Sequence, residues 1–268
     1  GQGEWNDYIS FMKAQLTELL TNYGEIGGIW FDGEWDQFKW DGKRFGEPMA
    51  DFKLAEVYSL IHKLQPQALI GSNHHLAPNP GEDFQMFEKD LPGRSTKSFA
   101  TSADDIGNLP LEVCETINGS WGFNLKDRKH KSKKELVQYL IKAAGYDSNL
   151  LLNVGPMPNG KIQEEHIKSL KEIGDWIKVN GETIYGTIRG PIDPNDEIAS
   201  TQKDNTIYIH LLDNRKTYFI EGYNPKIKKI SYYHSNKKVK YQKTKSGLII
   251  NVDDNELDEI DTIIELEI

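Results

Sequence analysis

An aspartate that ends a short apolar segment is the residue of this sequence best suited to carry out chemistry. Asp32 follows the apolar residues 26–31, which include Trp30, and Glu34 and Trp35 come shortly after it. Placing a carboxylate at the end of a buried strand costs free energy unless the charge is paired or used. A strand-end aspartate before a glycine is also ordinary turn chemistry, so the residues alone leave both interpretations open.

The segments around this aspartate alternate between helical and strand patterns. The predicted helices are residues 8–23, 51–64, 132–144 and 167–180, and the predicted strands are residues 26–31, 68–71, 111–117 and 149–154. The first helix is expected to stop at Tyr23–Gly24, and Ser132-x-x-Glu135 predicts a capping box at the start of the third. Such repeated units imply parallel strands joined by right-handed crossovers. A barrel is favoured over a doubly wound sheet, because charged and aromatic residues gather just after the strand ends, where barrels carry their active sites. We also expect residues 26–31 to form a strand covered on both faces.

The pattern changes after about residue 187. Short alternating stretches such as 206–212 and 247–252, separated by polar turns, predict an antiparallel β-sandwich without helices. The expected fold class is therefore α/β: part of a (β/α)8-like, TIM-type barrel over residues 1–188, followed by a C-terminal antiparallel β-sandwich over residues 189–268.

Three ordered segments resemble the α-L-fucosidases of glycoside hydrolase family 29. WFDGEW at 30–35 is similar to the nucleophile segment of that family, and NLLLNVGP at 149–156 and NGETIYG at 180–186 resemble two further family segments. The resemblance implies a retaining hydrolase that removes terminal α-L-fucose from fucosylated oligosaccharides or glycoconjugates. Asp32 then occupies the nucleophile position.

A retaining glycosidase needs a second carboxyl group ~5–5.5 Å from the nucleophile, which serves first as acid and then as base. Glu88 is the preferred candidate, because residues 83–88 resemble the segment that carries the acid/base in some bacterial relatives. Glu112 is the alternative, since LEVC at 111–114 resembles a segment of animal relatives. Glu82 and Asp83 lie where other relatives place an acid.

The residues that we expect to touch the sugar are aromatic, acidic or imidazole side chains near the strand ends: Trp30, Glu34, Trp35, His74, His75 and Trp121. Adjacent residues of an extended chain point in opposite directions, so at most one of the two histidines faces a ligand. His75 departs from the family pattern, which often has an arginine near this position. Trp121 could stack on the apolar face of fucose, with core packing as the alternative.

Charge and composition exclude several classes of partner. The net charge is −9, with 32 Lys and Arg against 41 Asp and Glu, which argues against nucleic acid or an anionic membrane. No apolar run approaches the ~20 residues of a membrane span, and the first residues lack an export-signal pattern; the cellular location stays unknown. With one cysteine and no Walker loop, dinucleotide-binding glycines or paired zinc motif, no cofactor or metal is expected.

The resemblance covers only the later part of the family fold, because the chain begins at a helix that precedes the nucleophile strand. Half a barrel exposes sheet edges and apolar surface, which natural chains cover. We therefore expect a homo-oligomer, with activity dependent on self-association or on a missing N-terminal part. Two other functions stay open: a non-catalytic carbohydrate-binding or interaction module, and a different barrel hydrolase such as a galactosidase.

Overall fold

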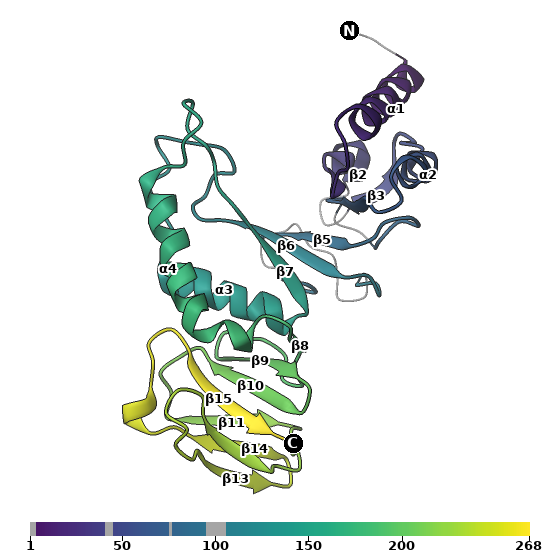
Figure 1. Ribbon diagram of the computed structural model, residues 1–268. Helices are drawn as coiled ribbons and strands as arrows, with labels where there is room; N and C mark the ends of the chain where they lie inside the picture. Colours follow the sequence, from purple (N-terminus) through teal and green to yellow (C-terminus); the bar gives the residue numbers. More distant parts are fainter. Residues whose placement is uncertain (1–3, 41–44, 75–76, 95–105) are drawn as a thin grey trace. The chain divides into compact units, whose positions relative to one another are not determined.

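The computed structural model describes residues 4–40, 45–74, 77–94 and 106–268 (Figure 1). By its internal contacts the chain divides into two compact units, Gly1–Val113 and Cys114–Ile268. No helix among the described residues is both long and apolar enough to cross a membrane.

The first unit alternates helices with short strands. Its elements are α1 (Trp5–Asn22), β1 (Gly28–Phe31), the 3-10 helix η1 (Glu34–Gln37), β2 (Phe38–Trp40), β3 (Phe45–Pro48), α2 (Leu54–Leu64), β4 (Leu69–Ser72) and β5 (Gln85–Glu88). β1 and β4 are parallel, in a register that pairs Gly28 with Leu69 and Phe31 with Ser72. The predicted parallel strand pair of the first half is thus confirmed.

The core of the first unit lies between α1, α2 and the β1–β4 pair. Leu16 and Leu20 of α1 pack with Val57 and Ile61 of α2 and with Ile70 of β4. Because these side chains recur three or four residues apart on each helix, they form one apolar face per helix. That packing fixes α1 and α2 against the strands that end at the candidate site.

The end of α1 is held by a buried glutamine. The side-chain amide of Gln65 donates to the carbonyls of Leu20 and Gly24, at 2.8 Å each, and so satisfies acceptors that a helix end leaves open. Gly24 has a φ of 87°, a conformation that glycine adopts without steric cost. The helix stop predicted at Tyr23–Gly24 is confirmed.

β1 is not covered on both faces in the described part of the chain, so that prediction is wrong. Gly28 and Trp30 are exposed, whereas Ile29 and Phe31 are half-buried. The physical reason is that β1 pairs with β4 alone among the described strands, and packing from α1 and α2 covers one of its faces.

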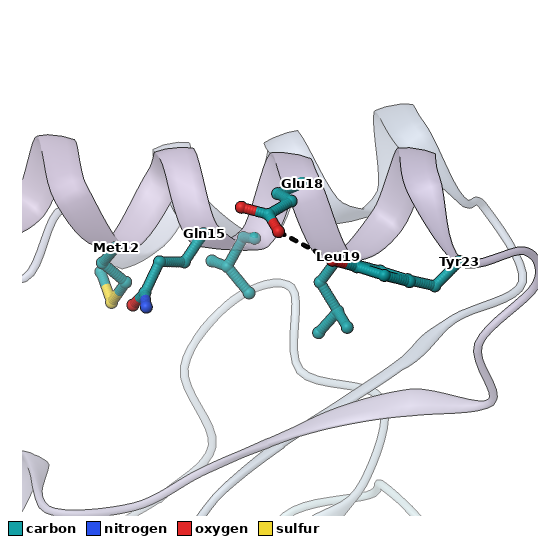
Figure 2. Close-up of a pocket in the computed structure, with 6 residues that line it drawn as sticks. Met12, Gln15, Glu18, Leu19 and Tyr23 are labelled. Atoms are coloured by element: carbon teal, nitrogen blue, oxygen red, sulfur yellow. Dashed lines mark hydrogen bonds between the residues drawn. The ribbon is translucent and has the colours of Figure 1, made fainter.

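α1 carries apolar side chains that are not used in this core. Tyr8, Phe11, Leu19 and Tyr23 are exposed, and the exposed fraction of Phe11 reaches 60%. Figure 2 shows the shallow pocket on this helix, which is lined by Met12, Gln15, Leu16, Glu18, Leu19 and Tyr23. The described residues thus leave this apolar surface of α1 uncovered.

The second unit begins within β6 (Leu111–Thr116) and continues with α3 (Lys133–Gly145), β7 (Ser148–Asn153), α4 (Glu164–Asn180) and the 3-10 helix η3 (Gly181–Thr183). The predicted capping box is confirmed at the start of α3. Ser132 Oγ accepts from the Glu135 amide at 3.2 Å, and the Glu135 carboxylate accepts from the Ser132 amide at 2.7 Å.

Antiparallel strands follow α4, as predicted. They are β8 (Ile188–Arg189), β9 (Ile198–Lys203), β10 (Thr206–Leu211), β11 (Thr217–Glu221), β12 (Lys229–Tyr232), β13 (Lys240–Thr244), β14 (Gly247–Asn251) and β15 (Thr262–Glu267), with the 3-10 helix η4 (Asp254–Glu256) before β15. Two sheets result, in the orders β12-β15-β10-β9-β8 and β11-β14-β13. One apolar core joins them, with Ile209 of β10 and Ile250 of β14 among its fully buried members. The division into domains at 188/189 stays a prediction.

His166 on α4 is a buried titratable group, and it predicts a pH dependence of stability. Neither of its ring nitrogens has a hydrogen-bond partner among the described residues, and its ring meets that of His130 edge-on at 5.5 Å. Burial, and secondarily the charge of His130, lower the pKa of His166 in the folded state. The unfolded chain then binds the proton more readily, so stability falls as the pH drops below the unfolded pKa of ~6.5.

The free energy of unfolding, measured by urea denaturation, is expected to rise between pH 5 and pH 8. His166→Leu should reduce this slope. His234→Gln, which removes an exposed histidine of the same unit, should leave it unchanged. A slope that is identical in wild type and His166→Leu would assign the pH dependence to other groups.

Candidate active site

Asp32 lies directly after β1, in the turn that leads into η1. Its Oδ1 accepts a hydrogen bond from the Gly33 amide at 2.9 Å, and Gly33 has a φ of 88°. This turn ends the strand and leaves the Asp32 side chain exposed. A carboxylate at that position is accessible to a ligand.

Asn73 occupies the equivalent position after β4. The register pairs Phe31 with Ser72, and the Asn73 amide donates to the Phe31 carbonyl at 2.8 Å, so Asp32 and Asn73 follow their strands side by side. Side chains at matched positions of parallel strands point the same way. Asn73 is buried, with an exposed fraction of 2%.

Glu88 ends β5 and meets the same asparagine. Asn73 Nδ2 lies 2.9 Å from Glu88 Oε2 and 3.3 Å from Asp32 Oδ1. Two oxygens at these distances from one nitrogen are at most about 6 Å apart, which is compatible with the ~5–5.5 Å separation of carboxyl groups in retaining glycosidases. Two of the predicted acids therefore meet, with one exposed and the other half-buried.

Glu112, the alternative second acid, has a different partner. It lies on β6, and its Oε1 accepts from Trp30 Nε1 at 3.3 Å. Trp30 lies on β1, two residues before Asp32, with an exposed fraction of 39%. The indole of Trp30 thus orients a third carboxylate beside β1.

Glu82 is the centre of a buried polar cluster. Its Oε1 accepts from the hydroxyl of Tyr58 at 3.0 Å and from the amide of Asn79 at 3.2 Å, and it lies 3.0 Å from Nε2 of His74. Burial is the main cause of a raised pKa for Tyr58, with the Glu82 charge acting in the same direction. His74 is only 2% exposed. His74, a predicted sugar contact, is therefore paired with the Glu82 carboxylate.

Asp83 also has structural partners. Its Oδ2 accepts from the backbone amide of Ile70 at 2.8 Å and lies 2.9 Å from Nε2 of His62. These contacts connect α2, β4 and the segment that leads to β5. The Asp83 carboxylate therefore has a structural role, which is to link these elements.

Glu34 begins η1 and lies close to the Glu82 cluster. Ser72 Oγ donates to its Oε2 at 3.5 Å. Burial raises the pKa of Glu34 most; His74 acts against that rise, and Glu82 adds to it. Its carboxyl group is therefore easier to protonate than an exposed glutamate.

The remaining predicted sugar contacts are Trp35, His75 and Trp121. Trp35 belongs to η1, and His75 falls outside the described residues. Trp121 lies in the second unit, in the loop after β6, where its carbonyl accepts from Asn153 Nδ2 at 2.8 Å; its side chain is 38% exposed. Within the described part of the chain, no group of three or more His, Cys, Asp or Glu side chains could hold a metal ion.

Asn73 is the site residue that the sequence did not single out. Its only signal is its place one residue after a predicted strand, the same place that Asp32 has after its own strand. Asparagine at a strand end is also a common turn residue, so this signal has no specificity by itself.

Comparison with known proteins identifies relatives for most of the chain. Residues 2–182 match the Alpha-L-fucosidase family. Alpha-L-fucosidase 1 of Arabidopsis thaliana is 30% identical over 65% of this chain and 35% of its own length. A putative alpha-L-fucosidase of Caenorhabditis elegans is 31% identical over 69% of this chain and 36% of its own.

Solved structures agree with these matches. Alpha-L-fucosidase isoenzyme 1 from Paenibacillus thiaminolyticus superimposes with a TM-score of 0.77 at 31% identity, over 100% of this chain and 63% of the other. The Thermotoga maritima alpha-fucosidase, solved in complex with fucose, has the same fold at 22% identity, with a TM-score of 0.72 over 97% of this chain and 56% of its own. The chain spans about a third of the length of the curated relatives that it matches.

Proposed function

Since the chain belongs to the alpha-L-fucosidase family, we propose that it supplies the two catalytic carboxylates of a retaining α-L-fucosidase, a glycoside hydrolase. The substrate is terminal α-L-fucose on a fucosylated oligosaccharide or glycoconjugate. The observation that carries this proposal is the pair Asp32 and Glu88, whose side chains share the amide of Asn73. No cofactor takes part.

The proposed reaction has two displacements. In the first, an Asp32 oxygen bonds to the anomeric carbon while the bond to the leaving oxygen breaks, and Glu88 transfers its proton to that oxygen. In the second, Glu88 takes a proton from water, the water oxygen bonds to the anomeric carbon, and the bond to Asp32 breaks. The product keeps its configuration, and both carboxyl groups return to their initial states.

The proposed substrate contacts are Trp30, Glu34, Trp35, His74, His75 and Trp121. Trp30 and Trp121 both have partly exposed indoles, which suit stacking on the apolar face of a sugar. We further propose that residues 1–188 are the later part of a (β/α)8-like barrel and that residues 189–268 form a separate sandwich domain.

A chromogenic aryl α-L-fucoside tests this function. Turnover of the fucoside, with little turnover of the matching aryl galactoside, is the expected result and separates a fucosidase from another barrel hydrolase. The exposed indoles also fit a non-catalytic carbohydrate-binding module. Fucose binding without turnover, in the chain alone and in its oligomer, would favour that second function.

We propose a second copy of the chain as a partner, and this gives a further prediction. The exposed side chains of α1 and the exposed face of β1 leave apolar surface that association would bury. Multi-angle light scattering at micromolar concentration should show a homo-oligomer.

Two matched substitutions locate that interface. Phe11→Ser on α1 should shift the population toward monomer, whereas Phe219→Ser, which changes another exposed phenylalanine on β11, should not. A wild-type chain that stays monomeric and unfolds cooperatively would contradict the proposed oligomer.

A further inference from the structure

Asn73 stands between two carboxylates in a buried position. Its Nδ2 group has two hydrogens, and the two acceptors within reach are Glu88 Oε2 at 2.9 Å and Asp32 Oδ1 at 3.3 Å. Each of the two N–H groups therefore has one carboxyl group to bind. One side chain from the end of β4 is hydrogen-bonded to residues after β1 and at the end of β5.

The orientation of this amide follows from the chemistry of its neighbours. An ionised Asp32 can only accept hydrogen bonds, and a protonated Glu88 still has a carbonyl oxygen that accepts one. The nitrogen of the amide, which is its donor end, therefore faces both acids. Asn73 Oδ1 is then left buried, and it has no hydrogen-bond partner among the described residues. A buried acceptor without a donor destabilises the fold, which argues that the donor end of this residue serves the carboxylates.

Two neighbouring carboxylates repel each other when both are ionised, and the repulsion would turn them apart. A donor shared by both opposes that movement, because each N–H bond is charge-assisted and directional. The backbone bond from the Asn73 amide to the Phe31 carbonyl, at 2.8 Å, fixes the donor in the register of the β1–β4 pair.

From this geometry we infer that Asn73 is a positioning residue, which holds Asp32 and Glu88 at the separation that a double displacement requires. The inference rests on the proposed function. In the first displacement Asp32 loses its charge as it bonds to carbon, and Glu88 gains charge as it gives up its proton. The side chain of Asn73 can keep one N–H bond to each carboxyl group during both changes of charge, without a change in its own position.

The decisive experiment does not depend on turnover. The Asn73 side-chain amide signals of the ¹⁵N-labelled chain are assigned by their absence from Asn73→Ser. Asp32→Asn is expected to shift one of the two amide protons and Glu88→Gln the other, because each proton points to a different acid. The signals of Asn180, whose Nδ2 donates to the Trp176 carbonyl at 3.0 Å, should stay in place in both variants.

Glu56→Gln is the matched control, since the carboxylate of Glu56 belongs to α2 and pairs with Lys13. It should leave the Asn73 signals unchanged. If neither Asp32→Asn nor Glu88→Gln moves the Asn73 signals, the shared amide does not exist in solution and the inference is overturned.

The second test measures kcat and KM for an aryl fucoside, in the assembly that hydrolyses it. Asn73→Ser should lower kcat by about 10- to 100-fold, the loss expected for a hydrogen bond to a charged group, with little change in KM. Asn73→Asp, which keeps the shape but replaces the donor with a third carboxylate, should lower kcat further. Wild-type kcat in Asn73→Asp would overturn the positioning role. Absence of turnover in the wild-type protein would instead refute the proposed function, with the spectra still deciding whether the amide is shared.

Discussion

Replacing Asp32 with glycine is expected to reduce turnover of an aryl α-L-fucoside by about 10³-fold or more, because the first displacement then has no nucleophile. Azide should restore part of the activity, since a small anion can enter the space that the side chain leaves and attack the anomeric carbon. The fold should persist, because the Asp32 side chain is exposed. The measurements are initial rates with and without azide, together with thermal unfolding.

Asp36→Gly is the matched control for this variant. Asp36 is another exposed aspartate, four residues further along in η1, and it takes no part in the proposed reaction. It should retain most of the activity and should not respond to azide. Activity near the wild-type level in Asp32→Gly, with the protein folded, would rule out Asp32 as the nucleophile.

The second large effect is expected at Glu88 and depends on the leaving group. Glu88→Ala should lose about 10²- to 10⁴-fold in rate on a fucoside whose leaving group is an alcohol, because departure of a poor leaving group requires a proton. The loss should be much smaller on an aryl fucoside with an acidic phenol, since that phenolate leaves without protonation. The measurement is kcat/KM over a series of leaving groups of graded acidity.

Glu112→Ala provides the comparison for Glu88→Ala. Glu112 accepts from the Trp30 indole, so its loss should affect binding through Trp30 and should act equally on all leaving groups. If the dependence on the leaving group appears in Glu112→Ala and is absent from Glu88→Ala, the two roles are exchanged. Glu88 would then serve as the second acceptor of Asn73 without transferring a proton.

The sequence predicted the local elements well, because their signals are local. The capping box Ser132–Glu135 and the stop near Gly24 depend on neighbours within a few residues. Apolar spacing predicted α1 and α2, and the short apolar runs predicted β1 and β4. Coverage of β1 was predicted wrongly, since that depends on which elements pack on the strand.

Within the site, the sequence indicates that a carboxylate ends the strand at Asp32 and that its surroundings resemble a nucleophile segment. It offered several second acids and could not choose among them by geometry, because their distances from Asp32 depend on segments far apart along the chain. The tertiary structure decided that Glu88 shares the Asn73 amide with Asp32, that Glu112 pairs with Trp30, and that Glu82 is buried against His74.

Asn73 shows most clearly why the tertiary structure was needed. An asparagine after a strand has no specific sequence signal, and its meaning comes from the parallel register that sets it beside Asp32 and from β5, which carries Glu88 to it. Local sequence fixes which side chains are available and where each strand ends. Strand pairing and packing fix which of them meet, because those interactions join residues that are 15 and 41 positions apart in the chain.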